Sequence, residues 1–370
     1  MLTDAAVGSA VQMSTMSLLA AMVDALPQPL IAVADDLRIK AVNRPSRDIL
    51  PSLRLGDPLA LALRDPTVLD AARLVNATGE RQVVLWRDRV PVERVFEVTV
   101  TKLQAVGTPP VVILSLDDLT EAWRIERMRA DFVANASHEL RTPLASILGF
   151  VETLQGPARD DTRARERFLA IMGEQARRMA RLVDDLLSLS RIEQKRHIKP
   201  SAPVNLSALV GHVADTLRGM AGDNGVALDL EVDPDVIVTG DHDELVRVAE
   251  NLIENAIKYG RKAGGTGIGT GQLQPVHVSV GTARRMGVLT VRDYGDGIAA
   301  EHLPRLTERF YRIDAGQSRA KGGTGLGLAL VKHIMAHHRG RLDIDSTLTE
   351  GSIFAASIPL FLKSETMPTV

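Results

Sequence analysis

The sequence predicts a multidomain α+β protein made of a small α/β module, a helical hairpin and a mixed α/β domain. Three observations carry this prediction. Short β-rich runs separated by helical or turn segments fill the region from Leu26 to about Leu116. Apolar residues then recur every three or four positions from Thr120 onward. After Pro203, helices and strands alternate, which is typical of a domain whose helices cover a sheet.

Composition sets the number of cores and excludes several classes of function. The 370 residues are 45% hydrophobic and 24% charged, enough for two or three domains that each bury a core. The net charge is −2, so no global field would attract nucleic acid, and we expect none as a partner. Cysteine is absent, which excludes disulfides, thiolate metal sites and cysteine nucleophiles.

We predict an N-terminal helix over residues 1–24. Within it, residues 5–23 carry no charge and are about long enough to cross a bilayer. Polar residues interrupt this stretch, and the first basic residue of the chain is Arg38, so flanking positive charges are missing. Membrane association is therefore not evident. We expect a cytoplasmic protein, with association with the inner membrane through residues 5–23 as the alternative.

Residues 25–117 predict the small α/β module, from β-rich runs such as LIAVAD, QVVLW and PVVILSL. Residues 118–198 predict the helical hairpin, because each helix has one apolar stripe and a breaker-rich polar turn, residues 156–161, separates them. Two helices enclose little volume, so such a hairpin usually completes its core with a second copy in a four-helix bundle. We therefore expect a homodimer.

A short linker precedes the third domain, predicted over residues 204–362, and residues 363–370 form a tail. One helical face of this domain gathers Asn251, Asn255 and Lys258 at spacings of four and three. Carboxamide oxygens suit a hard Mg²⁺ ion that keeps several waters, and an ammonium group meets phosphate oxygens as a point charge. An asparagine pair by itself more often belongs to a polar helix face.

Two glycine-rich turns of the third domain could approach a ligand closely. The turn DYGDGI follows a strand, and its Asp293 can accept a hydrogen bond from an exocyclic amine such as that of adenine. The run GGTGLGL opens a helix, so backbone N–H groups converge where an anion could bind. Each turn alone is a weak signal, because turns of this composition are common.

His138 is the candidate for covalent chemistry. It lies two residues from the stripe positions Ala136 and Leu140, so it should project outward. The next residue is Glu139, and a carboxylate that accepts one ring proton makes a neutral imidazole a better nucleophile toward phosphorus. Pro143 should kink the helix just past His138, since it cannot donate to the carbonyl of Glu139. A lone surface histidine is usually just solvated, so the adjacent glutamate favours the functional interpretation.

Taken together, the motifs SHELRTPL, NLIENAIKYG, DYGDGI, LTERFYRID, GGTGLGLAL and TEGSIFAASIP resemble the sensor histidine kinases of bacterial two-component systems, over about residues 120–359. The resemblance implies that the chain uses ATP and Mg²⁺ to phosphorylate its own His138 and passes the phosphoryl group to an aspartate of a response regulator's receiver domain. It further implies that Glu139 is the neighbouring acid/base residue. Thr142 matches the residue that orients water for dephosphorylating the regulator, which implies a phosphatase activity.

The same resemblance implies an α/β-sandwich ATP-binding domain of the Bergerat (GHKL) type. Asn255 matches the Mg²⁺ ligand, Asn251 its companion, and Asp293 the carboxylate that binds the adenine amine. The other positions that match nucleotide contacts or a mobile lid are Lys258, Tyr259, Gly295, Gly297, Ile298, Phe310, Gly323, Thr324, Gly325, Leu326, Gly327 and Leu328.

The N-terminal module is similar to a PAS sensor domain, from its opening ALPQPLIAVADDLRIKAVN and its exit VVILSLDDLTE, but no residue there identifies a ligand. The layout of the three parts is most similar to the phosphate-regulon type of these kinases. A rearrangement of the module would then be transmitted through the helix from Asp118 to Arg129.

Two further features have simpler interpretations. The glycine-rich stretch 264–271 looks like a phosphate loop, but no GK[ST] and no helix follow it, so we interpret it as a flexible insertion. His333 and His337 have the spacing of metal ligands on a helix, but the sequence offers no third ligand nearby, so we expect a solvated face.

Two other classes of function compete with a kinase. A dimeric scaffold without catalytic activity should have lost His138, Asn255 or Asp293, and all three are present. An ATP-driven conformational machine with the same nucleotide fold should lack the SHELRTPL helix, which is also present.

Overall fold

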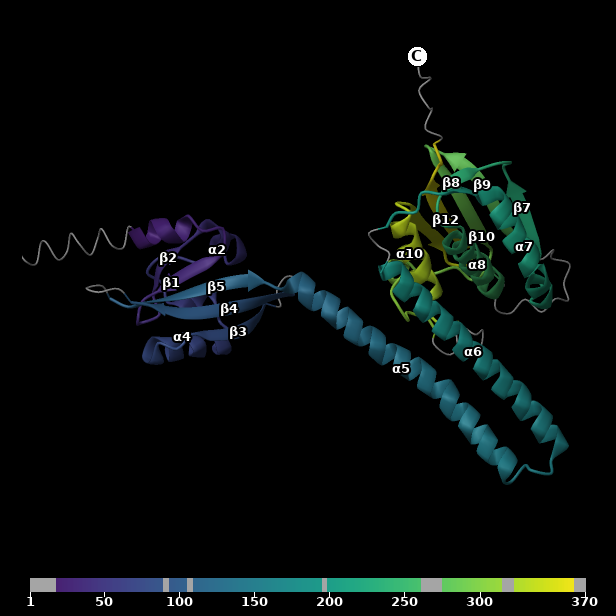
Figure 1. Ribbon diagram of the computed structural model, residues 1–370, viewed down its shortest axis with the longest axis horizontal. Coiled ribbons are helices and arrows are strands. Elements are labelled where there is room, and N and C mark those ends of the chain that lie inside the picture. The colour runs from purple at the N-terminus through teal and green to yellow at the C-terminus, as the bar shows by residue number, and fades with distance from the viewer. Residues whose placement is uncertain are drawn as a thin grey trace, which may run out of the picture. The chain divides into compact units, whose positions relative to one another are not determined.

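The computed structural model of the chain describes residues 18–88, 93–104, 109–194, 198–260, 275–314 and 323–362. It divides into two compact units, Met1–Asp131 and Phe132–Val370. The boundary falls inside the long helix α5, which spans Thr120–Gln155 (Figure 1). The candidate span at residues 5–23, the glycine-rich stretch 264–271 and the tail 363–370 lie wholly or largely outside the described residues.

The first unit contains a five-stranded antiparallel sheet in the order β2-β1-β5-β4-β3. One face of the sheet packs against α4 in a core that includes Phe96, Leu114 and Val75, and a helix over residues 18–24 packs on the other face through Val23. The elements are β1 (Leu30–Val33), β2 (Ile39–Val42), α2 (Arg44–Ile49), α3 (Leu59–Ala62), α4 (Pro66–Thr78), β3 (Gln82–Asp88), β4 (Arg94–Leu103) and β5 (Val111–Asp118).

Local sequence signals explain the limits of α4. The side chain of Asp65 accepts hydrogen bonds from the backbone N–H groups of Thr67 and Val68, and Pro66 occupies the first turn, where its missing N–H costs nothing. Gly79 ends the helix with a left-handed φ of 76°. These caps fix the helix against the sheet that it covers.

The first unit is tied to the start of α5 by buried polar groups. The backbone N–H of Val95 donates to the Thr120 hydroxyl at 3.0 Å, and the N–H of Thr120 donates to Asp118 Oδ1 at 2.9 Å. Two guanidinium groups, those of Arg87 on β3 and Arg127 on α5, lie 4.8 Å and 5.2 Å from the centre of the Trp123 ring. The first turns of α5 therefore belong to the sheet module.

The second unit begins with the predicted hairpin. Helix α6 spans Thr162–Gln194, and the turn between the helices occupies residues 156–161, as expected. Pro143 lies inside α5, which continues past it to Gln155. Several apolar residues of the two helices are largely exposed in the single chain, among them Leu144, Leu148, Leu169, Val183 and Leu187.

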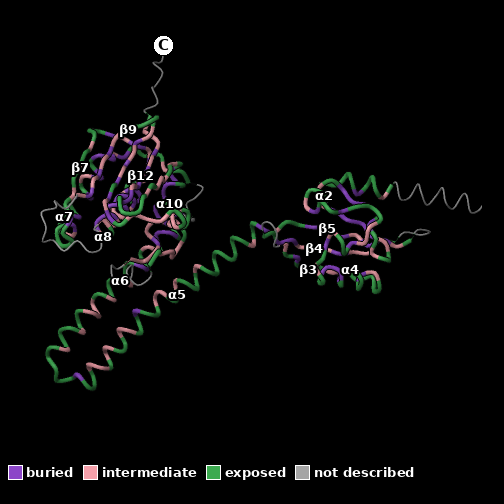
Figure 2. Tube along the Cα trace, turned by 180° about the vertical axis from the view of Figure 1, so that it is seen from behind, coloured by how far each residue is buried: buried purple, intermediate pink, exposed green. Residues whose placement is uncertain are grey.

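The rest of the second unit is a two-layer α/β domain. Its five-stranded sheet has the order β11-β12-β10-β9-β7, with β7 parallel to β9 and the other pairs antiparallel. Helices α7, α8 and α10 pack on the sheet, and the buried residues, purple in Figure 2, gather along α8 and the strands. The elements are β6 (Pro203–Asn205), α7 (Leu206–Asp223), β7 (Leu228–Val232), β8 (Ile237–Thr239), α8 (His242–Tyr259), β9 (Val276–Ala283), β10 (Met286–Asp293), η1 (Leu303–Arg305), α10 (Gly327–His337), β11 (Arg341–Thr347) and β12 (Gly351–Pro359).

The predicted fold class is confirmed: a sheet module, a long helical hairpin and an α/β domain follow one another along the chain. The limits of the four predicted domains and the tail stay predictions. No helix in the described part of the chain is both long and apolar enough to span a membrane.

Candidate functional site

Helix α8 separates a buried face from a polar face. Leu252, Ile253, Ala256 and Ile257 are buried in the core, which leaves the predicted residues Asn251, Asn255 and Lys258 half-buried on the other side. The Lys258 ammonium donates to Glu254, one turn earlier. The three residues therefore share one face, as their spacing predicted.

Asn251 marks where α8 meets the glycine-rich run. Its Nδ2 donates to the carbonyl of Arg247 at 2.8 Å, so its Oδ1 points the other way, toward the start of α10. A Cβ atom added to Gly327 would lie 2.3 Å from this Oδ1, so a larger residue here would displace the Asn251 side chain from its present position.

Asp293 ends strand β10 and is 5% exposed. Burial raises the pKa of its carboxyl group, and hydrogen bonds from the backbone N–H groups of Gly295 and Ser352 oppose that rise. The Gly295 bond to Asp293 Oδ1 is 2.9 Å long. A Cβ atom on Gly295 would lie 2.2 Å from the Tyr259 carbonyl oxygen, so this turn lies against the end of α8. A buried carboxylate here is a directional acceptor for a polar ligand group.

The remaining predicted positions border the same region. In the turn after Asp293, Gly297 has a φ of 71°, and the Ile298 N–H donates to the Ser346 hydroxyl at 2.8 Å. The N–H of Phe310 donates to the carbonyl of Gly325 at 2.7 Å, which joins the two ends of the segment 311–324. The positions that open α10 are Gly323, Thr324, Gly325, Leu326, Gly327 and Leu328.

Phe310 has a strained backbone. Its φ of 63° is in the left-handed region, which is unfavourable for a bulky side chain. Its ring lies 5.9 Å from the ring of Phe132 on α5, and the Arg309 guanidinium lies 5.1 Å from the same Phe132 ring. The hairpin therefore contacts the segment that borders the candidate nucleotide site.

The donor set fits a Mg²⁺-bound nucleotide. The start of α10 lies beside Asn251 on the polar face of α8, and the turn that follows the buried Asp293 lies beside the end of the same helix. Asn255 offers a carboxamide oxygen of the kind that Mg²⁺ accepts beside water and phosphate oxygens. The residues present therefore suit the predicted ligands, ATP and Mg²⁺.

His138 is exposed on α5, which confirms that it projects outward. Thr142, one turn later, donates its hydroxyl hydrogen to the His138 carbonyl at 3.2 Å. The kink predicted at Pro143 stays a prediction.

The Glu139 carboxylate is held by two arginines. It accepts a hydrogen bond at 3.0 Å from Arg178 on α6 and another at 3.0 Å from Nη2 of Arg312, whose Nη1 is 3.5 Å from the other carboxylate oxygen. The Arg312 side chain is 7% exposed, Arg178 12% and Glu139 24%. Within the described residues, Glu139 therefore bonds to guanidinium groups and not to the ring of His138.

A second polar contact joins the hairpin to the glycine-rich run. The Thr324 hydroxyl donates to Asp185 Oδ2 on α6 at 2.9 Å. Burial raises the pKa of Asp185, and the hydrogen bond from Thr324 opposes the rise.

Sequence reasoning missed these hairpin contacts and misjudged one histidine. Arg312 and Glu139 are 173 positions apart, and Thr324 and Asp185 are 139 apart, so no periodic pattern could connect them. The solvated-face interpretation was wrong for His337, which is buried and paired with Glu244 on α8. A histidine next to apolar helix positions, together with an acidic residue in the first turn of another buried helix, was the available signal.

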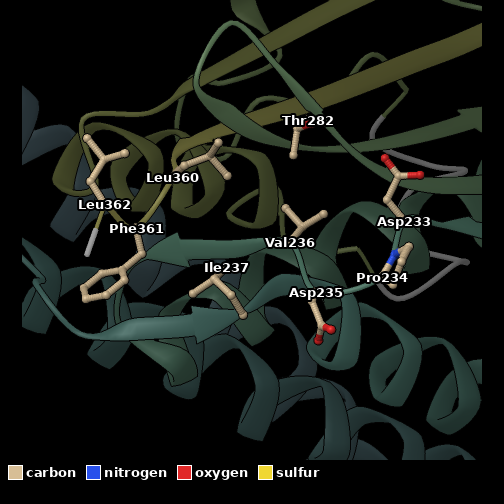
Figure 3. Close-up of a pocket in the computed structure, with 9 residues that line it drawn as sticks. All are labelled: Asp233, Pro234, Asp235, Val236, Ile237, Thr282, Leu360, Phe361 and Leu362. Atoms are coloured by element: carbon tan, nitrogen blue, oxygen red, sulfur yellow. The ribbon is translucent and has the colours of Figure 1, made fainter. Parts of the chain in front are cut away.

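An open groove of about 540 Å³ lies elsewhere on this domain (Figure 3). Acidic side chains, Asp233 and Asp235, lie at one end of it, and Leu360, Phe361 and Leu362 at the other. None of the predicted site residues lines this groove.

Comparison with known proteins identifies two domains. Residues 128–195 match the His Kinase A (phospho-acceptor) domain, and residues 240–362 match the family described as histidine kinase-, DNA gyrase B- and HSP90-like ATPase. The matched ranges contain His138 and the predicted nucleotide residues, respectively.

Individual relatives agree with these matches. The chain is 38% identical over 242 residues to the phosphate regulon sensor protein PhoR of Pseudomonas aeruginosa, covering 65% of this chain and 52% of PhoR. It is 28% identical over 316 residues to the sensor protein SrrB of Staphylococcus aureus, covering 85% of this chain and 52% of SrrB. The chain thus spans about half the length of the curated relatives it matches.

A solved structure of the histidine kinase ThkA in complex with the response regulator protein TrrA aligns with a TM-score of 0.48 at 20% identity, covering 92% of this chain and 97% of that one. The phospho-acceptor domain, the ATPase domain after it and the likeness to PhoR together show that this chain belongs to the sensor histidine kinases.

Proposed function

We propose that the chain is an ATP-dependent protein-histidine kinase that phosphorylates His138 and passes the phosphoryl group to an aspartate of a response regulator. One observation carries this proposal beyond family membership. The helix that displays His138 contacts the candidate nucleotide site, through Glu139 with Arg312 and through Phe132 with Phe310. These contacts bring the helix that carries His138 to the edge of the candidate nucleotide site, which supports a functional role for this histidine.

In the proposed step the protein mainly positions the reacting groups and neutralises the phosphate charge. A ring nitrogen of neutral His138 attacks the γ-phosphorus of ATP, the bond from that phosphorus to the bridging oxygen breaks, and ADP leaves. The ring then carries a proton on its other nitrogen, and Glu139 is the carboxylate nearest in sequence that could accept it. Phosphoramidates of histidine are acid-labile, which gives the product a chemical signature.

The described arrangement holds Glu139 away from that role. Two guanidinium groups bond its oxygens, and among the described residues no hydrogen bond joins Glu139 to the ring of His138. We propose that the arrangement precedes the reaction, and that movement of the α/β domain on the linker near Pro200 frees Glu139.

The residues of the α/β domain have matching proposed roles. Asp293 binds the adenine amine, Asn251, Lys258 and the N-terminus of α10 face the phosphates, and Asn255 holds Mg²⁺. Bound Mg²⁺ would neutralise phosphate charge. Tyr259, Phe310 and the glycines of the two turns would line or close the nucleotide site.

Several finer predictions belong to the same proposal. A homodimer is supported by the apolar residues that both hairpin helices leave exposed and by the phospho-acceptor domain match. Removal of the phosphoryl group from the regulator with help from Thr142, a PAS-type sensor role for the first unit and a cytoplasmic location also remain proposals. Cell fractionation would test the last of these.

The decisive experiment is incubation of the purified protein with γ-labelled ATP and Mg²⁺. We expect acid-labile, alkali-stable label on the wild type and none on His138→Ala. A matched control is His212→Ala, which removes an exposed histidine from α7 and should leave labelling unchanged. Label that survives in His138→Ala would refute the assignment of the phospho-acceptor.

A further inference from the structure

The end of α10 contains a buried charged cluster that the proposed kinase chemistry does not use. His337, the last residue of α10, is 4% exposed at its side chain, and its Nδ1 is 2.8 Å from Glu244 Oε2 on α8. Its Nε2 is 2.6 Å from the backbone carbonyl oxygen of Ile198, in the linker that follows α6. The imidazole thus bridges the α/β domain and the linker.

Both partners of the His337 ring are acceptors. A carbonyl oxygen cannot donate, and an ionised carboxylate cannot donate either, whereas a neutral imidazole has a single N–H. Both contacts are therefore hydrogen bonds only when His337 and Glu244 together hold one extra proton. An imidazole is a stronger base than a carboxylate, which favours that proton on the ring. The position of His337 at the C-terminus of α10 also favours a cation, because the helix dipole is negative at that end.

The neighbouring His338 does not share this charge. Its Nε2 accepts a hydrogen bond from the Asp241 backbone N–H at 2.9 Å, and its Nδ1 bonds the Ile334 carbonyl at 2.9 Å. Burial lowers the pKa of His338, so the ring is neutral with its hydrogen on Nδ1. The titratable groups that face the His337–Glu244 pair thus include a neutral His338 and, beyond it, the Asp241 carboxylate.

The same contacts argue against a metal ion in this cluster. Glu244, His337 and His338 do offer ligand atoms within 4.8 Å of one another. However, the single lone pair of neutral His338 already accepts the Asp241 N–H, and a metal on His337 Nδ1 would displace the proton that joins it to Glu244. The cluster is therefore built to hold a proton.

The linker depends on this proton. Ile198 is 70% exposed, so apolar packing does not hold the residue, while its carbonyl is bonded by His337. Four residues later the Ala202 carbonyl accepts from the Gly240 N–H at 2.9 Å, and the pairing of β6 with β8 follows. Before the linker, Leu189 and Ile192 of α6 are buried in the core of the α/β domain.

We propose that His337 is an imidazolium in the folded protein and that its proton fastens the linker after α6 to the α/β domain. Both hydrogen bonds of the ring, to Glu244 and to the Ile198 carbonyl, are present while His337 is protonated. One of them is lost when the pH rises far enough to deprotonate the ring. Losing the tie frees the stretch of linker before Ala202. In this respect the inference rests on the proposed function, because a freer linker matters to a kinase whose α/β domain must move toward His138.

The protonation state can be measured without any kinase assay. Two-dimensional ¹H–¹⁵N spectra of the imidazoles, in the full chain at about pH 7.5, should show both His337 nitrogens protonated, where a free imidazole is mostly neutral. A neutral His337 with one protonated nitrogen would overturn the proposal. Zn²⁺ added alone should leave the His337 signals in place, and their replacement by those of a metal-bound ring would overturn it too. The wild-type measurement requires no variant to fold.

The tie to the linker can be tested with a spin label, because the chain has no cysteine of its own. A nitroxide on Ile198→Cys should give a restricted spectrum in the wild-type background and a mobile one with His337→Gln or with Glu244→Gln. The loss of a hydrogen bond to a charged group predicts a change of roughly 10- to 100-fold in the ratio of tied to free linker. His212→Gln, at an exposed position of α7, is the matched control.

Identical spectra in all four backgrounds would refute the tie. Because these readouts need neither ATP nor phosphorylation, their failure would leave the proposed kinase activity untouched. Conversely, failure of His138 labelling would leave the imidazolium and the linker contact open to the same measurements.

Discussion

Replacing Asp293 by asparagine tests the nucleotide site most directly. The change keeps the shape of the side chain and removes its charge. It also replaces one oxygen by an N–H₂ group in a carboxylate that now accepts hydrogen bonds from the backbone N–H groups of Gly295 and Ser352. At 5% exposure, water cannot compensate. The new amide has a single acceptor oxygen, for which these backbone N–H groups and the adenine amine would compete.

The expected loss is that of one hydrogen bond to a charged group. Such bonds contribute about 1.5–3 kcal/mol, which corresponds to roughly a 10- to 150-fold weaker Kd for ATP. Isothermal titration calorimetry on the purified protein would measure this, with circular dichroism to confirm that the variant is folded. Asp296→Asn, an exposed neighbour in the same turn, should change the Kd by less than about twofold. An Asp293→Asn variant that is folded and binds ATP as tightly as the wild type would refute the role given to this carboxylate.

Other predictions concern the pH response, the start of α5 and the hairpin surface. Burial raises the pKa of Asp293, so ATP binding should weaken as the pH falls through that raised value and the acceptor becomes protonated; titrations at several pH values should show this for the wild type and not for Asp293→Asn. Thr120→Val leaves the buried Val95 N–H unpaired and should destabilise the first unit by about 1–3 kcal/mol in calorimetry of the full chain, whereas Thr216→Val, at an exposed position of α7, should not. Leu148→Lys charges an exposed apolar position of α5 and should shift the chain from dimer to monomer in light scattering; an unchanged mass would argue against a hairpin dimer.

The periodic and local features could be predicted from the sequence. Apolar spacing predicted the hairpin, and the spacing of Asn251, Asn255 and Lys258 predicted their shared face, because helix geometry converts short separations into proximity. The contacts of Glu139 with Arg178 and Arg312 could not be predicted, since they depend on how a helix from one part of the fold packs on another. The error at His337 has the same origin: its solvent exposure is decided by α8 and the linker, which lie far away in sequence.

Because of the way α5 begins, the fluorescence of the two tryptophans of this chain reports on one part of the molecule. Trp86 is buried against Phe96, with ring centroids 5.0 Å apart, and the guanidinium groups of Arg87 and Arg127 lie over the ring of Trp123. Both indoles belong to the first unit, and the second unit has none. Intrinsic tryptophan emission therefore reports on the sheet module and the first turns of α5, which hold both indoles. A shift in emission on adding ATP would show that nucleotide binding in the second unit changes the first unit. A shift on adding a candidate stimulus would show that the stimulus acts on the first unit.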